Sequence, residues 1–177
     1  SPDNELFLME LDRNSGATNW ITTAGGIGND DGGPVAIDSM GNIWQAGTTT
    51  GTFSVNGMTH QAVSNADTIL VKWSPSGVAQ SVIGFSSSAS EINLPEDMIV
   101  TSNDDVVVSG VFLGSMNAGN QNTLTDRGNG DAYVVKVLKS GITDWATSAG
   151  SSANTERAYS IAETPNGDII AGGMIST

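Results

Sequence analysis

A repeat period of 63 residues is the feature that most constrains how this chain can fold. One apolar string occurs three times, as ELFLMEL at residues 5–11, DTILVKW at 67–73 and DAYVVKV at 131–137. A second string ends at Gly47, Gly110 and Gly173, which are 63 residues apart each time. A fixed period indicates a repeat architecture, in which each unit buries its apolar faces against its neighbours. We therefore expect one repeat domain with units at about 1–65, 66–129 and 130–177.

Each unit carries four strand patterns, and no segment has a convincing helix pattern. The first strand of each unit is almost continuously apolar, which is typical of a strand covered on both faces. Glycine, asparagine, aspartate and serine fill the short stretches between strands and predict hairpin turns there. The predicted strands cover residues 5–11, 18–24, 35–38, 43–48, 67–73, 79–85, 98–101, 106–111, 131–137, 143–149, 160–163 and 169–174.

A small additional hairpin is expected in the segment that follows the fourth strand of the first unit. Asn56 and Gly57 stand between two alternating stretches, 52–55 and 58–61. Asn-Gly is the dipeptide that most favours a two-residue hairpin turn, because both of its residues accept positive φ.

The predicted fold class is all-β, with four-stranded antiparallel sheets of the β-propeller type and a β-solenoid as the alternative. Sets of four short antiparallel strands are typical of propeller blades. In this arrangement 35–85 and 98–149 form complete blades, while 5–24 and 160–174 form two halves of one blade. A ring of three blades is smaller than the usual 4–8. We therefore expect the chain to be a segment of a longer protein or to associate with copies of itself.

The net charge of the chain limits the classes of partner that it can bind. Nineteen acidic and six basic residues give a net charge of −13. Such a surface repels nucleic acid and anionic membranes. No apolar run approaches the roughly 20 residues of a membrane-spanning helix, and the absence of cysteine rules out disulfides and thiolate chemistry.

The repeat resembles a known family. The third unit carries the pattern in Asp131 to Lys136, Ser140-Gly141, Trp145, Ala149-Gly150 and a final string from Gly167 to Gly173. This set of motifs is similar to the bacterial β-propeller repeats often called SBBP repeats, and it covers almost the whole chain. Glu10 departs from the pattern because it stands where Lys72 and Lys136 do. The resemblance implies a scaffold or adhesion module of secreted or surface-attached proteins, and it supplies no catalytic residue.

Few residues could carry catalysis. His60 is the only histidine, so a Ser-His-Asp triad would have a single possible base; we interpret His60 as a surface loop residue. Glu91, Glu96 and Asp97 could act as paired carboxylates, but they lie in a segment with no visible partner. We predict that the chain is not an enzyme.

Oxygen-rich turns are the only candidate metal sites. Carboxylates and amides at these positions could ligate calcium, but their spacing matches no calcium motif, and we favour turn-capping roles and no bound metal or other cofactor. The weak candidates are Asn29, Asp30, Asp31, Asp104 and Asp105.

The four tryptophans divide into two pairs. Trp20 and Trp145 occupy equivalent places in the first and third units, and we predict that they pack between sheets as buried wedges. Trp44 and Trp73 have no aromatic counterparts in the other units, which makes them weak candidates for a sugar or peptide platform.

We expect a non-enzymatic structural or interaction module, extracellular or at the cell surface, that serves adhesion, scaffolding or assembly. The partner is expected to be protein, through self-association or neighbouring repeats, with the terminal strands at 5–11 and 169–174 carrying the contact. The first alternative is a carbohydrate-binding, calcium-assisted lectin-like module, and the second is a fragment of a propeller enzyme.

Overall fold

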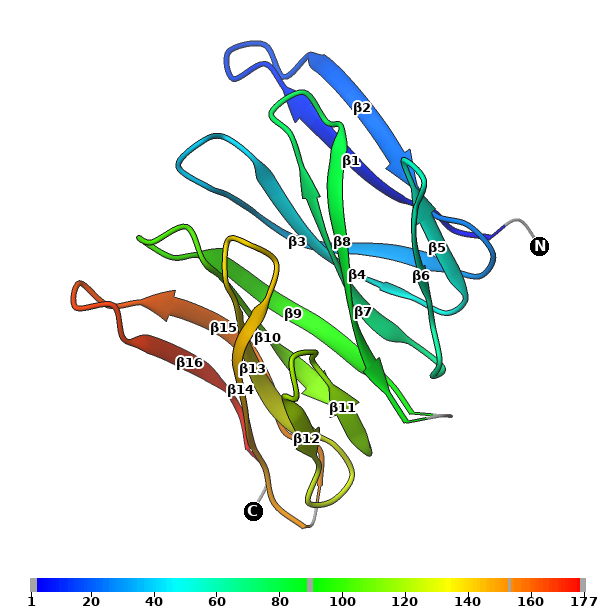
Figure 1. Cartoon of the computed structure of the whole chain (residues 1–177). Helices are drawn as coiled ribbons and strands as arrows, with labels where there is room; N and C mark the ends of the chain where they lie inside the picture. The colour runs from blue at the N-terminus through cyan, green and yellow to red at the C-terminus, as the bar shows by residue number, and fades with distance from the viewer. Residues whose placement is uncertain (1–2, 89–90, 153, 176–177) are drawn as a thin grey trace.

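A computed structural model describes residues 3–88, 91–152 and 154–175 of the chain, and its regular structure consists of β-strands joined by turns (Figure 1). The described residues contain sixteen strands and no helix, which confirms the all-β prediction. They accordingly include no helix long and apolar enough to cross a membrane.

Two complete sheets form the middle of the molecule, and each has four antiparallel strands contributed by parts of two successive repeat units. The first complete sheet is also extended by two short strands from a later hairpin. Its strands are β3 (Asp30–Ile37), β4 (Ile43–Thr49), β7 (Asp67–Trp73) and β8 (Ala79–Ser87), with β11 (Ser115–Asn117) and β12 (Thr123–Thr125) added beyond β8. The second complete sheet contains β9 (Asn93–Val100), β10 (Val106–Phe112), β13 (Asp131–Val137) and β14 (Thr143–Ala149).

Two half-sheets of two strands each lie at opposite ends of the stack (Figure 1). The N-terminal half-sheet is β1 (Leu6–Leu11) with β2 (Thr18–Ala24), and the C-terminal half-sheet is β15 (Arg157–Glu163) with β16 (Ile169–Met174). A separate hairpin, β5 (Thr52–Val55) with β6 (Met58–Gln61), turns at Asn56 and Gly57 with φ angles of 53° and 79°. The predicted Asn-Gly hairpin is therefore confirmed.

The same strand register occurs in both complete sheets. In the first, β4 pairs with β7 so that Ile43 faces Trp73. In the second, β10 pairs with β13 so that Val106 faces Val137. All the pairings between the described strands are antiparallel, whereas a β-solenoid of the parallel type would stack parallel strands.

The first strand of each complete sheet is longer than its sequence indicated. Predicted at 35–38 and 98–101, these strands begin at Asp30 and Asn93. Pro34 and Pro95 lie inside them, and such residues suggest a break because proline cannot donate to the ladder. Both strands are edge strands, and each carries a register shift at the proline-containing segment, where a missing N–H costs little.

The sheets pack face to face around two apolar clusters. The larger cluster fills the space between the complete sheets and includes Trp44, Leu70, Val108 and Val135. The smaller lies between the first complete sheet and the N-terminal half-sheet. Strands β3, β9 and β15 contact one another in sequence along one side of the stack.

Trp20 and Trp145 are half-buried rather than buried, so that part of the prediction is wrong. Trp20 does act as a wedge, because a Cβ at Gly77 of the next sheet would come within 2.8 Å of its ring. Its indole N–H donates to Glu10 at 2.7 Å. Trp145 lies where the C-terminal half-sheet offers no equivalent turn to cover it.

Candidate functional site

The two tryptophans proposed as a ligand platform lie in the core. Trp44 and Trp73 are fully buried, Trp44 between the complete sheets and Trp73 against the N-terminal half-sheet. The Lys72 ammonium group lies 5.0 Å from the centre of the Trp44 ring. Neither ring can stack on a sugar from this position, so the platform interpretation is corrected. The two tryptophans lack aromatic counterparts in the other units because each fills a space in its own part of the core.

Two of the oxygen-rich candidates belong to the turn between the strands β9 and β10. Asp104 accepts hydrogen bonds from the backbone N–H of Ser39 at 2.8 Å and from its hydroxyl at 2.7 Å. These two bonds, the backbone bond first, lower the pKa of Asp104. Asp105 instead binds the Lys136 ammonium group at 3.1 Å and accepts from the Lys139 N–H. The neighbouring carboxylates therefore serve different partners.

Ser102 and Glu163 repeat the same contact one unit later. Ser102 donates to the Glu163 carboxylate through its N–H at 2.7 Å and its hydroxyl at 3.0 Å. Ser39 and Ser102 are one period apart, and each joins its hairpin to the next sheet along the chain. We call this two-bond contact the serine–carboxylate clamp. In the third unit the equivalent position is Pro165, which has no N–H to donate.

The other oxygen-rich candidates, Asn29, Asp30 and Asp31, also do not converge. Asn29 accepts from the Asn4 N–H at 3.3 Å, while Asp31 is exposed. Asp30 is buried, and burial raises its pKa by more than the hydrogen bonds from Thr49 and Gly26 lower it. No group of three or more histidine, cysteine, aspartate or glutamate side chains suited to a metal ion occurs within residues 3–88, 91–152 and 154–175.

A buried polar residue recurs at the junction of successive sheets, and the sequence interpretation missed it. Asp30, Asn93 and Glu156 are 63 residues apart and are all buried. Each accepts a hydrogen bond from a backbone N–H earlier in the chain: Gly26, Thr68 and Ser151, respectively. The signal that could have found them was the period itself, applied to polar rather than apolar residues.

His60 is not a surface loop residue. It lies on β6, and its Nε2 is 2.9 Å from Oδ2 of the fully buried Asp67. Burial alone would raise the pKa of Asp67, but hydrogen bonds from His60, Ser64 and the Val63 N–H outweigh it and lower the pKa. Asp131, the counterpart of Asp67, binds Arg127 in the same way. The only histidine therefore anchors the hairpin of β5 and β6 to the first complete sheet.

Two of the three carboxylates considered for acid–base chemistry bind structural partners. Glu96 accepts from the Arg157 guanidinium group at 2.6 Å, and Asp97 accepts from the Ile161 N–H at 2.9 Å. Both contacts connect β9 with β15. Glu96 and Asp97 therefore hold the second complete sheet and the C-terminal half-sheet together.

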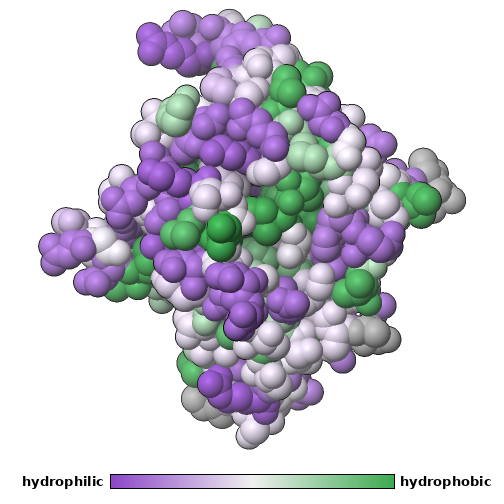
Figure 2. Space-filling view, viewed as in Figure 1, coloured by the Kyte–Doolittle hydropathy of each residue, from purple (hydrophilic) through white to green (hydrophobic). Residues whose placement is uncertain are grey.

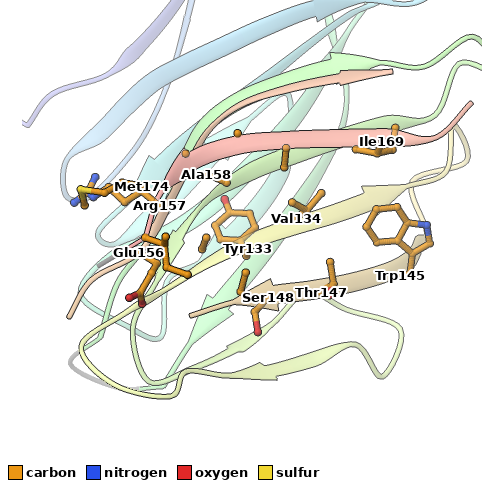
Figure 3. A pocket seen from close by; sticks show the side chains of 16 residues that line it. Tyr133, Val134, Trp145, Thr147, Ser148, Glu156, Arg157, Ala158, Ile169 and Met174 are labelled. Atoms are coloured by element: carbon orange, nitrogen blue, oxygen red, sulfur yellow. The ribbon is translucent and has the colours of Figure 1, made fainter. Parts of the chain in front are cut away.

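A hollow of about 400 Å³, which we call the C-terminal groove, lies between β14, β13 and the C-terminal half-sheet. Figure 3 shows Trp145 at one end of it, Glu156 and Arg157 at the other, and Val134 with Tyr133 between them. Ile169 and Met174 line it from β16. Its walls are mainly apolar. The surface seen in Figure 2 differs from the walls of this groove, because apolar and polar side chains are interspersed over that face of the molecule.

The face of β1 that points away from the stack is apolar and exposed. Phe7, Met9 and Leu11 are 53%, 43% and 47% exposed. Their counterparts in both complete sheets are fully buried: Ile69, Val71, Trp73, Tyr133, Val135 and Val137. The same positions are covered wherever a preceding sheet is present, and among residues 3–88, 91–152 and 154–175 no sheet covers this face of β1.

No family model and no curated protein matches the chain, and the similarity to bacterial β-propeller repeats therefore rests on the quoted residues alone.

Proposed function

We propose that this chain is a non-enzymatic structural and interaction module made of propeller-type blades, and that it works outside the cell or at the cell surface. The proposal joins the resemblance to bacterial β-propeller repeats with the stacking of successive antiparallel sheets. A stack of sheets with an exposed apolar face at one end suits adhesion, scaffolding or assembly.

The serine–carboxylate clamp is the observation that carries this proposal. Two clamps, Ser39 with Asp104 and Ser102 with Glu163, join one sheet to the next with the same chemistry. Asp67, Glu96 and Asp97 likewise bind partners within the fold. Hydrogen bonds to charged groups are among the stronger ones in proteins, so carboxylates used in this way rigidify the stack.

A lectin-like function is the second candidate, and the C-terminal groove is the observation that favours it. Trp145 offers a half-buried aromatic ring, with Arg157 and Ser148 among the polar groups around the groove. Pockets that bind small ligands combine apolar walls with a few polar groups in this way. Trp44 and Trp73, the tryptophans first considered for sugar binding, are buried and take no part.

A glycan array with and without millimolar calcium separates the two candidates. The structural proposal predicts no saturable binding in either condition and a melting temperature that calcium and magnesium change equally little. Calcium-dependent binding that Trp145→Ala abolishes would establish the lectin-like function instead. Magnesium serves as the control for an unspecific effect of divalent charge.

A further inference from the structure

The two half-sheets are complementary, and the repeat of the register tells how they would join. The free edge of β16 corresponds to the edge of β10 that pairs with β13, and the free edge of β1 corresponds to the edge of β13 in that pair. We propose that β1 of a second copy of this chain adds to β16, so that two half-sheets complete one four-stranded sheet between the copies. The proposal rests on the interaction function proposed above and names its partner.

The expected register follows from the two complete sheets. Val106 faces Val137 there, and Ile43 faces Trp73. One repeat later, the same register places Ile169 opposite Leu11 of the second copy and Gly173 opposite its Phe7. Free strand edges of this kind are templates for backbone pairing with another chain.

The exposed face of β1 matches the C-terminal groove. In the second complete sheet, Tyr133, Val135 and Val137 of β13 are buried on the side of the preceding sheet. Their counterparts on β1 are Phe7, Met9 and Leu11, and the added strand would bring them over Val134 and the rest of the groove. Burial of this apolar surface is the main driving force for association.

Trp145 finds a partner in the same arrangement. Its counterpart Trp20 packs against Gly77, in the turn of the next sheet. Trp145 lies two repeats after Trp20, and two repeats after Gly77 the corresponding turn is the one containing Gly16 of the second copy. A Cβ at Gly16 would meet nothing within 4 Å in the isolated chain, so the space beside this turn is open for the indole ring.

Gln45 indicates that the free edge of β1 lacks a strand. Its Nε2 donates to the Phe7 carbonyl at 2.9 Å, and its own Oε1 is buried without a hydrogen-bond partner among the described residues. Burying an amide oxygen without a partner is costly. A strand added to β1 would bring backbone N–H groups to this place.

The contact between copies would be weaker than the contacts within a chain. Pro165 has neither the N–H nor the hydroxyl that a serine donates in the clamp. The positions of the accepting carboxylates are taken in the following sheet by Gly41 and Ile37, which have no carboxylate. Glu10 would also stand where Lys136 stands, and its carboxylate would approach Asp168 instead of repeating the Lys136–Asp105 ion pair. Association should therefore be reversible and should tighten with salt.

The charge at position 10 supplies the sharpest test. Sedimentation velocity of the full chain over a range of concentrations should show reversible association. The affinity should be highest for Glu10→Lys, intermediate for Glu10→Gln and lowest for the wild type. Glu10→Lys converts a repulsion into an ion pair with Asp168 and should tighten the dissociation constant roughly fivefold. Adding Asp168→Asn should remove most of that gain.

Loss of the apolar contact should have the opposite effect. Phe7→Ser should weaken association roughly tenfold or more, while Val63→Ser, an equally exposed substitution on a loop, should not change it. Melting at low concentration checks that both variants fold. A chain that stays monomeric at every concentration, or associates with an affinity unchanged by Glu10→Lys and Phe7→Ser, would overturn the proposal. The structural function would fail separately, through glycan binding on the array.

Discussion

Strand β7 lies inside a complete sheet, whereas β1, its counterpart one repeat earlier, is the edge of a half-sheet. Both strands carry apolar residues at equivalent positions, yet Ile69, Val71 and Trp73 are fully buried while Phe7 and Met9 are about half exposed. The burial of the strand is therefore not decided by its own residues. It is decided by whether a neighbouring sheet covers the strand, as expected for repeats that cannot bury their faces alone.

The largest expected difference between the two strands concerns their last residues, Trp73 and Leu11. Trp73→Ala should lower the free energy of unfolding by about 3–5 kcal/mol, because it leaves a cavity in the core. Leu11→Ala, measured where the chain is monomeric, should change it by about 0.5–1 kcal/mol. Urea unfolding of both variants tests the comparison. Similar losses would mean that the N-terminal half-sheet is already covered in the isolated chain.

A smaller effect is expected at the junction between the N-terminal half-sheet and the first complete sheet. Asp30 has a raised pKa there, and its counterpart between the complete sheets is the neutral Asn93. Asp30→Asn should stabilise the chain at pH 7, because it removes a buried charge whose ionised form is disfavoured.

The pH dependence gives the sign of this effect. Since the folded pKa of Asp30 lies above its unfolded value of about 3.9, protonation on acidification favours the folded state. The gain from Asp30→Asn should therefore shrink as the pH falls through the raised pKa. Asp31→Asn, at the exposed neighbour, is the control. A gain that persists unchanged at pH 4 would show that the charge is not its cause.

The smallest effect is expected at the clamp between the complete sheets. Hydrogen bonds from Ser39 lower the pKa of the exposed Asp104, so its contribution to stability is present above the unfolded pKa of about 3.9 and is lost as the pH falls through the folded value. Asp104→Asn should thus lower the melting temperature at pH 7 and have less effect in acid. A double-mutant cycle with Ser39→Ala measures the coupling. Additive losses would mean that the clamp does not join the sheets.

The sequence predicted the strands well where apolar residues repeat. Strands β2, β7, β13, β14 and β16 have the predicted bounds, because their patterns recur with the period. The starts of β3 and β9 were missed because Pro34 and Pro95 suggest breaks, and only the sheet order shows that both strands are edges.

The candidate sites were less predictable, because a residue type does not reveal its partner. Trp44 was considered for a surface platform because it has no aromatic counterpart in the other units, and His60 was expected at the surface because it is a lone histidine in a predicted loop. Trp44 proved to pack between the complete sheets, and His60 binds Asp67 seven residues away. The clamp of Ser39 with Asp104 spans 65 residues and depends on how two hairpins meet, which no local pattern encodes.

The most direct test of the account is hydrogen exchange of the backbone amides measured at increasing chain concentration. In a single chain, β1 and β16 each have one unpaired edge, and in the proposed pair of copies these two edges would pair with each other. Strands β7 and β13 are already paired on both sides within one chain. We predict that protection of amides in β1 and β16 rises with concentration while protection in β7 and β13 stays constant. Protection in β1 and β16 that is independent of concentration, and already as high as in β7 and β13, would contradict the account.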